Sequence, residues 1–461
     1  MTDRSRGTAV ALRRVALLVA ATCATVRAEE YRPRQPNLLA PVLESAAIIG
    51  LGTGWYWLDR KTNAPDWDDP PWTSRFSGDA WRLDTNRFAI NFVGHPVTGA
   101  LSYGLARAHD LGPLNAFGVA LGTSLAWELG IEFRERVSLN DIVVTAPSAV
   151  PLAEVLYKLG VELAAAADRD LQLPVDARGR FVEARVGAGP IAATRGGGGA
   201  SFGASLVAEA TLLWVEGARA DAAFERVLVG AEHATGRLAV SGTEAGLGVD
   251  ADAQVLVFGW TRQRASAPGS ASHAVTVGMP LGFRYRGDTS LGFRDRVSWL
   301  RGGGPSLELW TRGDLGEMRL ELDAGLHVGG HGARAYTGWS SEYPGVPGKS
   351  ILARDGYFYG WGPSVRASAS WRLGGFSVRT RVDVAGAWSI DGLDRARETL
   401  GPEVDAAALR IEGGAEAAIA VPLEGASIAV AGDAVRVGSR VGGVNEFETA
   451  QSLAVRLVRV W

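Results

Sequence analysis

Cysteine and methionine are almost missing from this sequence of 461 residues, which contains one Cys and three Met. The single cysteine, Cys23, lies close to the N-terminus, so no pair of thiols is available for a disulfide. A Cys-ligated metal site is excluded for the same reason. We therefore predict a protein without a disulfide framework, and we expect no metal and no other cofactor.

A charge excess of either sign is also missing. The 47 Lys and Arg residues are balanced by 50 Asp and Glu residues, which leaves a formal net charge of -3. The basic residues are scattered and form no stripe that could neutralise phosphates, so nucleic acid is not an expected partner. The mean hydropathy of +0.05 is too low for a polytopic helical membrane protein, because each helical span needs about 20 mostly apolar residues.

Glycine and tryptophan, in contrast, are abundant, with 60 and 15 residues. A β-barrel in lipid suits this composition, because every second residue faces the lumen and can be polar. The average hydropathy of such a barrel stays near neutral while glycine and aromatic residues accumulate.

The N-terminus has the pattern of an export signal. Four arginines between positions 4 and 14 precede the apolar run 15–26, and a small-residue site ends at Ala28. This pattern predicts a signal peptide over residues 1–28, cleaved after Ala28. Lipidation of Cys23 is the alternative, and Thr22 directly before the cysteine fits it poorly.

Residues 29–165 are predicted to form a helical domain with four helices. Helical periodicity covers 41–58, 97–109 and 114–133, and the pattern Ser138-Leu-Asn-Asp141 resembles a capping box that opens a last helix to about residue 163. The segment 65–81, rich in Pro, Asp and Trp, is predicted to be an exposed loop. The helix 114–133 is apolar on most sides; because Glu128 and Glu132 interrupt it, we favour a helix buried in a bundle over a membrane span.

After a linker over residues 166–180, the period changes from that of a helix to two, and residues 181–461 are predicted to form an antiparallel transmembrane β-barrel. The alternation is clear over 275–285, 318–328, 357–371 and 376–388. Tight connections near 312–317, 373–375 and 422–426 alternate with long ones at 287–304, 329–355 and 389–405. We expect about 12 strands, an even number because both barrel ends should lie on the periplasmic side. Residues 216–250 leave the count open, and a large soluble β-sandwich or propeller is the competing fold.

A barrel of this kind belongs in the bacterial outer membrane, with the lipid bilayer and lipopolysaccharide as its surroundings. The last strand, 452–461, ends in Trp461 and resembles the terminal aromatic signal read by the barrel-assembly machinery, from which Arg459 departs. We therefore expect that machinery as a partner.

Short motifs are spaced through the helical domain between Asn91 and Glu154. They comprise Asn91, Gly94-His95-Pro96, Gly99, Tyr103, Ala106-Arg107, Ser124, Trp127-Glu128, Glu132, Ser138, Asp141 and Glu154. With these motifs, about residues 80–165 resemble the uncharacterised bacterial envelope family labelled domain of unknown function 3943. The chain departs from the family pattern at Ser102-Tyr103, where a pair of tyrosines is expected, and at Leu139-Asn140. The resemblance implies a location in the envelope and no particular activity.

The polar residues of this apolar domain are the candidate site. The candidate catalytic residues are His95, Glu128, Glu132 and Asp141, and the candidate binding residues are Arg107, Arg136 and Glu154. A histidine beside two carboxylates one helical turn apart could serve as an acid/base pair or as ligands for a divalent cation. We favour the competing interpretation, in which Glu128 and Glu132 pair with Arg107, Arg134 or Arg136 and lock the helix packing.

The predicted lumen carries charges of both signs. Arg284, Arg286, Arg319, Arg366, Arg372, Arg379 and Arg381 lie on the same side of their strands as Glu317, Glu321 and Asp323. A salt-bridged interior is the interpretation that we favour, and a selective pore is its rival.

Three functions remain open from the sequence. The leading hypothesis is a non-enzymatic outer-membrane protein with a helical plug or periplasmic domain and a structural, binding or transport role. The second is an outer-membrane hydrolase that acts on lipid or envelope polymer through His95 with Glu128 or Glu132, although no G-x-S-x-G, H-E-x-x-H or C-x-x-C motif is present. The third is a small-solute porin. No small-molecule ligand is indicated.

Overall fold

The computed structural model describes residues 36–58, 67–83, 86–167, 180–195, 198–215, 223–244, 246–264, 272–288, 296–333, 335, 355–390, 405–423 and 425–460. The predicted signal peptide (1–28), most of the predicted linker (166–180) and Trp461 lie outside these ranges.

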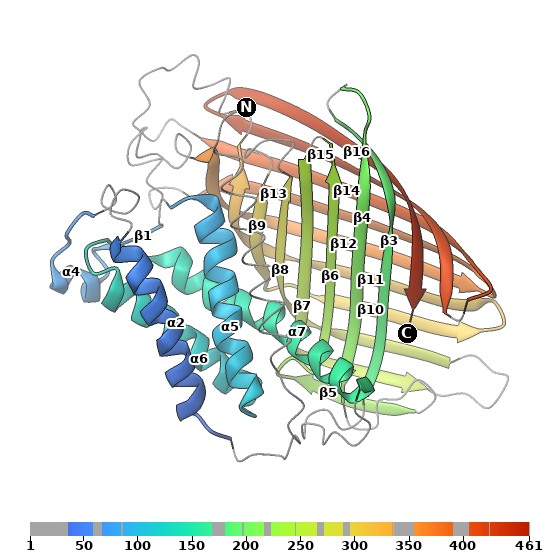
Figure 1. The fold of residues 1–461 in the computed structure, drawn as a ribbon, viewed down its shortest axis with the longest axis horizontal. Coiled ribbons are helices and arrows are strands. Elements are labelled where there is room, and N and C mark those ends of the chain that lie inside the picture. Colours follow the sequence, from blue (N-terminus) through green and yellow to red (C-terminus); the bar gives the residue numbers. More distant parts are fainter. Residues whose placement is uncertain are drawn as a thin grey trace.

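The described residues between 39 and 167 are mainly helical, as predicted (Figure 1). The four expected helices are α2 (Leu39–Leu58), α5 (His95–Ala108), α6 (Pro113–Ala126) and α7 (Ala146–Ala167). Three π-helical turns extend them: η2 (Ile90–Gly94) before α5, η3 (Trp127–Ile131) after α6 and η4 (Asp141–Thr145) before α7. Two short parallel strands, β1 (Trp81–Arg82) and β2 (Val137–Ser138), pair between them.

The helix boundaries follow from local chemistry. Pro113 begins α6 and Pro96 lies in the first turn of α5, where the missing N–H of proline costs no hydrogen bond. The predicted cap is confirmed, because the Asp141 N–H donates to the Ser138 Oγ atom at 3.4 Å. The segment 65–81, predicted to be a loop, contains the short helix α4 (Trp72–Ser77), which ends at Gly78 with a φ of 92°.

The barrel consists of fourteen strand segments in one antiparallel sheet. They are β3 (Arg180–Arg195), β4 (Ser201–Trp214), β5 (Phe224–Val229), β6 (His233–Thr243), β7 (Gly246–Arg264), β8 (Ser272–Asp288), β9 (Val297–Gly302), β10 (Ser306–Gly313), β11 (Gly316–Gly332), β12 (Tyr357–Leu373), β13 (Phe376–Ser389), β14 (Ala406–Ala420), β15 (Ala426–Val441) and β16 (Val444–Val460). The segments β5 and β6 both pair with β7, and β9 and β10 both pair with β8 and β11. Around the barrel, β5 and β6 therefore share one strand position, and β9 and β10 share another. The fourteen segments of the described residues thus correspond to twelve strand positions. The barrel closes because β16 pairs with β3.

The predicted alternation and strand number are therefore confirmed. Apolar side chains such as Leu320, Val365 and Val382 point outward, and charged ones such as Arg319, Arg366 and Asp383 point into the lumen. One predicted connection is wrong: the interval 287–304 contains β9, whose run Val297 to Gly302 is too short for a recognisable alternation. A closed sheet with an apolar outer face and a charged interior is the arrangement that lipid requires, because lipid cannot hydrogen-bond an open strand edge. The protein is an outer-membrane β-barrel.

The helices lie beside the barrel wall (Figure 1). The side chain of Val155 in α7 packs on the outward residues Leu212 of β4, Ala234 of β6 and Val255 of β7. Segment 88–92 packs on Tyr357 and Tyr359 of β12. The prediction of a helical plug is not supported in the described part of the chain, because every one of these contacts uses the outer face and the lumen is occupied by the barrel's own side chains.

Candidate functional site

Two groups of buried charged side chains stand out, one in the helical domain and one in the barrel lumen. The first contains Glu128, Glu132 and Asp141, which we call the carboxylate cluster. Each of the three offers an oxygen atom, and these atoms lie within 4.8 Å of one another. All three side chains are buried.

His95 joins the carboxylate cluster from the start of α5. Its Nε2 atom lies 3.5 Å from the Asp141 Oδ2 atom. The four predicted catalytic residues therefore meet in space, at the common end of α5, η3 and η4. A histidine next to a buried carboxylate is an arrangement that can hold or move a proton.

Local structure explains why the carboxylates meet. The π-helical turn η3 carries Glu128, and η4 begins with Asp141. The Ser138 N–H donates to the Glu128 Oε2 atom at 2.8 Å, and the Asn140 Nδ2 atom donates to the Asp141 Oδ1 atom at 2.7 Å. Backbone and amide donors thus hold both acids in place. Three carboxylates at this spacing are hard oxygen ligands that suit Mg²⁺, Ca²⁺ or Mn²⁺.

A buried cation close to the cluster is Arg75 of α4, which sequence reasoning missed because it lies in a segment predicted to be a loop. Its guanidinium group is fully buried and donates to the backbone carbonyls of Glu128, Phe133 and Glu135. Burial lowers the pKa of Arg75, and the charges of Glu128 and Glu132 oppose this effect. Arg75 thereby ties the end of η3 to α4 and offsets part of the negative charge of the cluster.

The predicted binding residues lie elsewhere. Arg107 and Glu154 form a buried pair with the Arg107 Nε atom 3.0 Å from the Glu154 Oε2 atom, and the Tyr103 hydroxyl donates to the same oxygen at 2.8 Å. Lys158 lies 3.7 Å from the other Glu154 oxygen. Of the three arginines that were predicted to pair with Glu128 and Glu132, Arg107 thus binds a different acid. Glu154, one turn before Lys158 on α7, is the acid that faces Arg107.

Arg134 and Arg136 are the other two arginines that were predicted to pair with Glu128 or Glu132. Arg134 donates to Asp69 at 2.8 and 3.1 Å, and this hydrogen bond lowers the pKa of the exposed Asp69 carboxyl. Arg136 is half-buried in the turn between η3 and β2. The pairing of Glu128 or Glu132 with Arg136 stays a prediction.

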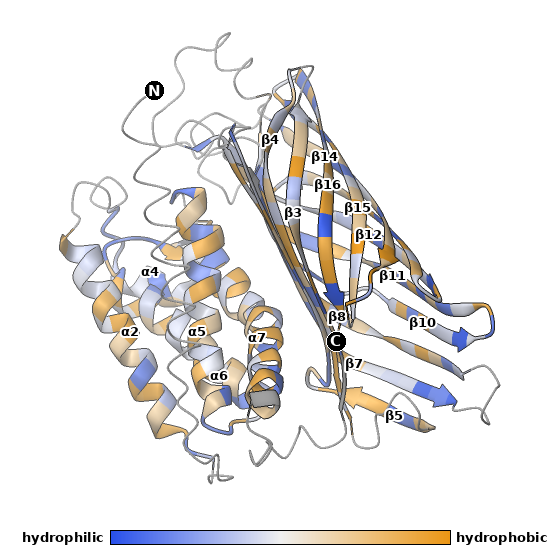
Figure 2. Ribbon diagram, turned by 45° about the vertical axis from the view of Figure 1, so that its right-hand side comes forward, coloured by the Kyte–Doolittle hydropathy of each residue, from blue (hydrophilic) through white to orange (hydrophobic). Residues whose placement is uncertain are grey.

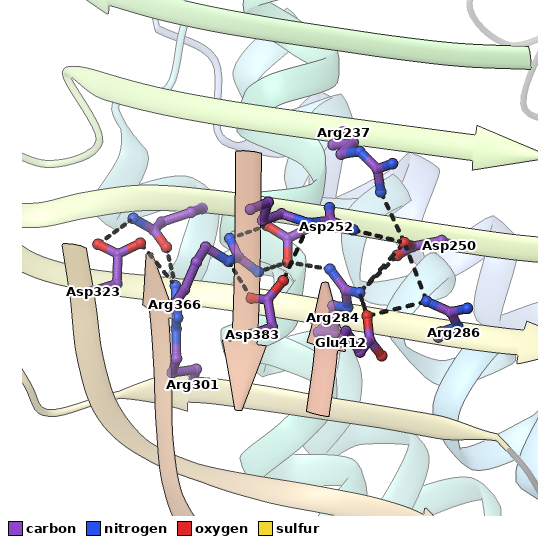
Figure 3. A network of polar contacts seen from close by, with 12 residues as sticks. Arg237, Asp250, Asp252, Arg284, Arg286, Arg301, Asp323, Arg366, Asp383 and Glu412 are labelled. Carbon is purple, nitrogen blue, oxygen red and sulfur yellow. Dashed lines mark hydrogen bonds and ion pairs between the residues drawn. The ribbon is translucent and has the colours of Figure 1, made fainter. Parts of the chain in front are cut away.

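The second group fills the lumen. We call the following residues the lumen network: Arg237, Asp250, Asp252, Arg284, Arg286, Arg301, Asp323, Arg366, Arg381, Asp383 and Glu412 (Figure 3). Arg366 of β12 lies between Asp252 and Asp383 and donates to them at 2.7 Å each. Arg284 of β8 contacts Glu412 of β14. The predicted salt-bridged interior is present.

Several of these contacts cross the lumen. The strands β7 and β12, which carry Asp252 and Arg366, are four positions apart around the barrel. Arg379 of β13 reaches Glu209 of β4 at 2.9 Å in the same way. Between the pairs a cavity of about 200 Å³ remains, lined among others by Glu209, Arg379 and Arg237.

Sequence reasoning missed the acids that complete the lumen network. Asp250 and Asp252 lie at the edge of the segment that could not be assigned, and Glu412 lies on a strand rich in alanine and glycine. The alternation Asp250-x-Asp252-x-Gln254 on β7 is the signal that would have found two of them.

A family model described as "Domain of unknown function (DUF3943)" matches residues 80–181, which confirms the resemblance seen in the sequence. The match extends from just before β1 to the start of β3, so it covers most of the helical half and not the barrel. No curated protein matches the chain.

Solved structures that are similar to this chain are outer-membrane barrels. An anion-selective porin from Comamonas acidovorans is 8% identical over 61% of this chain and 100% of its own, with a TM-score of 0.20. The outer membrane protease OmpT from Escherichia coli is 9% identical over 61% of this chain and 96% of its own, with a TM-score of 0.19. The translocator domain of the autotransporter NalP from Neisseria meningitidis is 10% identical over 67% of this chain and 96% of its own, with a TM-score of 0.21. At this level of likeness, none of their activities transfers to this chain.

Proposed function

We propose that the protein is a non-conducting outer-membrane barrel that anchors the helical domain on its outer wall, with a structural or binding role in the envelope. The observation that carries this proposal is the set of ion pairs across the lumen. Arg366 with Asp252, Arg284 with Glu412 and Arg379 with Glu209 join strands on opposite sides of the barrel. These side chains occupy the space through which a solute would have to pass.

The outer wall supports the anchoring role. Ser298 of β9 donates to the backbone carbonyl of Phe92 at 3.3 Å, and Asn91 binds two tyrosine hydroxyls of β12. Polar contacts of this kind fix the orientation of the helical domain as well as its position.

Conductance across a planar lipid bilayer tests the proposal. We expect the purified full-length protein to show no steady current of the size of an open pore. The double variant Arg366→Ala with Asp252→Ala removes both members of one crossing pair and should increase the leak. Asp383 keeps Arg381 as a partner and Arg284 keeps Glu412 in this variant. A steady pore-sized current through the unsubstituted protein would overturn the proposal and favour the small-solute porin.

The second candidate function is a hydrolase that uses His95 with Glu128 or Glu132. The distance of 3.5 Å between His95 Nε2 and Asp141 Oδ2, beside two more carboxylates, favours it. Proton transfer by His95 would then depend on Asp141, and a substrate would come from the envelope lipids or polymers. If His95→Ala and Glu128→Gln variants fold normally and complement a deletion strain, the hydrolase is excluded.

A further inference from the structure

One end of the helical domain touches the barrel where the barrel begins and ends in sequence. The Trp214 Nε1 atom, at the end of β4, donates to the Glu162 Oε1 atom of α7 at 3.1 Å, and the Lys158 Nζ atom lies 4.4 Å from the Trp214 ring centre. A Cβ atom at Gly230, beside β5, would lie 3.9 Å from the Cγ atom of Pro113 at the start of α6. This end of the barrel also holds the short connections 314–315 and 374–375. Short turns and chain ends mark the periplasmic side of outer-membrane barrels.

The other end of the helical domain touches the opposite rim of the same outer wall. The Asn91 Nδ2 atom donates to the Tyr359 hydroxyl at 2.6 Å and to the Tyr357 hydroxyl at 3.2 Å, at the start of β12. The Phe88 N–H donates to Asp355 at 2.6 Å. The long connections 333–356 and 390–405 lie at this rim, which marks it as the extracellular side.

The helical domain therefore extends along the full height of the strands on the face that elsewhere contacts lipid. Its helices have the length needed for this: α2 has 20 residues, about 30 Å at 1.5 Å per residue, which equals the hydrocarbon thickness of a bilayer. With their π-helical turns, α5 runs from Ile90 to Ala108 and α6 from Pro113 to Ile131. The segment Asp141–Ala165 is long and apolar enough to cross a membrane.

We propose that α2, α5, α6 and α7 form a four-helix bundle embedded in the outer-membrane bilayer beside the barrel, with lipid acyl chains covering the surface that faces away from the wall. A domain in the periplasm could not reach Tyr357 and Tyr359 on the outer face of the far rim without crossing the same layer. The proposal depends on the barrel spanning the membrane and not on the closure of its lumen.

The exposed surface of α2 has the chemistry of a lipid-facing helix. This helix lies farthest from the barrel wall and α7 lies nearest (Figure 2). Its exposed side chains include Leu39, Val42, Leu43, Leu51, Trp55 and Leu58, and Leu51 is 80% exposed. At the extracellular end, Trp72, Phe76 and Phe133 are also exposed, and the rings of Trp72 and Phe133 stack 6.2 Å apart. Aromatic rings at this level are typical of a membrane interface.

Most charged side chains of the four helices lie inside the bundle, away from the surface that would contact lipid. Arg107, Glu154 and Lys158 bind one another inside the bundle, and the carboxylate cluster is buried at its extracellular end. Glu44 is the exception on the exposed face of α2, and it lies 3.1 Å from His109. Ionisable residues in a membrane face the bundle interior and pair with one another. Glu128 and Glu132, which argued against a span in the sequence, are among the buried ones.

The chain direction is consistent with this placement. The pair Glu44 and His109 joins the first half of α2 to the end of α5 at the periplasmic side, and Tyr56 near the end of α2 donates to Glu135 at 2.6 Å at the extracellular side. The helices α2 and α6 thus ascend and α5 and α7 descend. Four crossings return the chain to the periplasmic side, where β3 begins.

Single thiols report which surface contacts lipid. In full-length protein with Cys23→Ser, each of three variants carries one cysteine: Leu51→Cys on α2, Leu320→Cys on the lipid-facing side of β11, and Leu315→Cys in the water-exposed turn between β10 and β11. The proteins are placed in nanodiscs of phosphatidylethanolamine and phosphatidylglycerol, which leave both membrane faces open to reagents. A charged, membrane-impermeant maleimide measures contact with water, and a bimane label quenched by dibrominated phospholipid measures contact with acyl chains.

We expect Leu51→Cys to react at least tenfold more slowly than Leu315→Cys, and its bimane to be quenched as strongly as that of Leu320→Cys. Reaction as fast as that of Leu315→Cys would place α2 in water and overturn the proposal. Slow reaction without quenching by brominated lipid would mean that protein, such as a second copy of this chain, covers α2, and this outcome would overturn it as well. Full reaction of all three thiols after denaturation in dodecyl sulfate is the control for thiol reactivity.

Discussion

Gly236 of β6 lies directly under Val155 of α7, and a Cβ atom at position 236 would come within 2.5 Å of the Val155 Cγ1 atom. A side chain at position 236 would overlap the Val155 side chain, so one of the two would have to shift. The contact lies in the middle of the interface between the bundle and the barrel, beside Ala234 and Val255. Absence of a side chain at one position therefore sets how closely α7 approaches the wall.

A side chain at position 236 should push α7 outward. We expect Gly236→Val to destabilise the docked helical domain by about 1–3 kcal/mol, the usual cost of overpacking. Thermal unfolding in detergent micelles, followed by tryptophan fluorescence, measures the change. Gly242→Val on the same strand is the matched control, because a Cβ atom there meets nothing within 4 Å. Equal effects of the two substitutions would mean that the contact with Val155 does not limit the packing.

Removal of a central cation should destabilise the lumen network. Arg284 is 3% exposed and contacts Asp250, Asp252 and Glu412. Arg284→Ala leaves these acids without one of their buried partners, and we expect a loss of about 3–5 kcal/mol. The control is Arg372→Ala, because the Arg372 side chain is 42% exposed and its acidic partners are 3.8 and 3.9 Å away; its cost should stay within about 0.5 kcal/mol. Urea unfolding in micelles distinguishes the two, and a small effect of Arg284→Ala would show that the crossing pairs contribute little.

Asn91 holds the helical domain to the extracellular rim of the barrel through Tyr357 and Tyr359. Asn91→Ala removes the donor to the hydroxyls of Tyr357 and Tyr359, so we expect a loss of about 1–3 kcal/mol for the unsatisfied buried groups. The rate of limited proteolysis of the helical domain, compared before and after substitution, measures loosening of the bundle. Asn445→Ala at the exposed start of β16 should leave that rate unchanged. An unchanged rate in Asn91→Ala would locate the anchor elsewhere, for example in the aromatic contacts of Phe88 and Phe92.

Removal of a charge inside the bundle should destabilise the protein more than removal of a charge on the bundle surface. Glu154→Gln leaves Arg107 and Lys158 together without their buried acid, and we expect destabilisation by about 3–5 kcal/mol. Glu44→Gln changes an acid that is 45% exposed, and its effect should be at most about 1 kcal/mol. Thermal unfolding of both variants in the same detergent gives the comparison. Similar losses would argue against a low-dielectric bundle interior.

The elements that sequence reasoning placed correctly are those with a regular period. The alternation over 318–328 and 357–371 identified β11 and β12, and the Ser138 cap identified the start of the last helix. Both signals are local, because they depend on neighbours in the chain. The segment Val297 to Gly302 was missed since six residues between two irregular connections carry too little period to be seen.

The site was predicted in part for a related reason. His95, Glu128, Glu132 and Asp141 were identified because acids and a histidine are conspicuous in apolar helices, and they do meet. Arg75 was not identified as a neighbour of this cluster, and Glu154 was not identified as the partner of Arg107. Arg75 reaches the cluster from a short helix more than fifty residues earlier, and Arg107 turns to Glu154, 47 residues away, because the relative rotation of packed helices decides which polar faces meet.

The sequence by itself determined the class of each half, because hydrophobic period is a property of consecutive residues and distinguishes a helix from a strand with one apolar and one polar face. Only the tertiary structure decided where the helical half lies. A helix that is apolar on most sides is equally compatible with burial in protein and burial in lipid. An apolar strand face can likewise pack against acyl chains or against a helix. Close approaches such as that of Val155 to Gly236 select between these outcomes, and they depend on residues 81 positions apart that meet only in the folded protein.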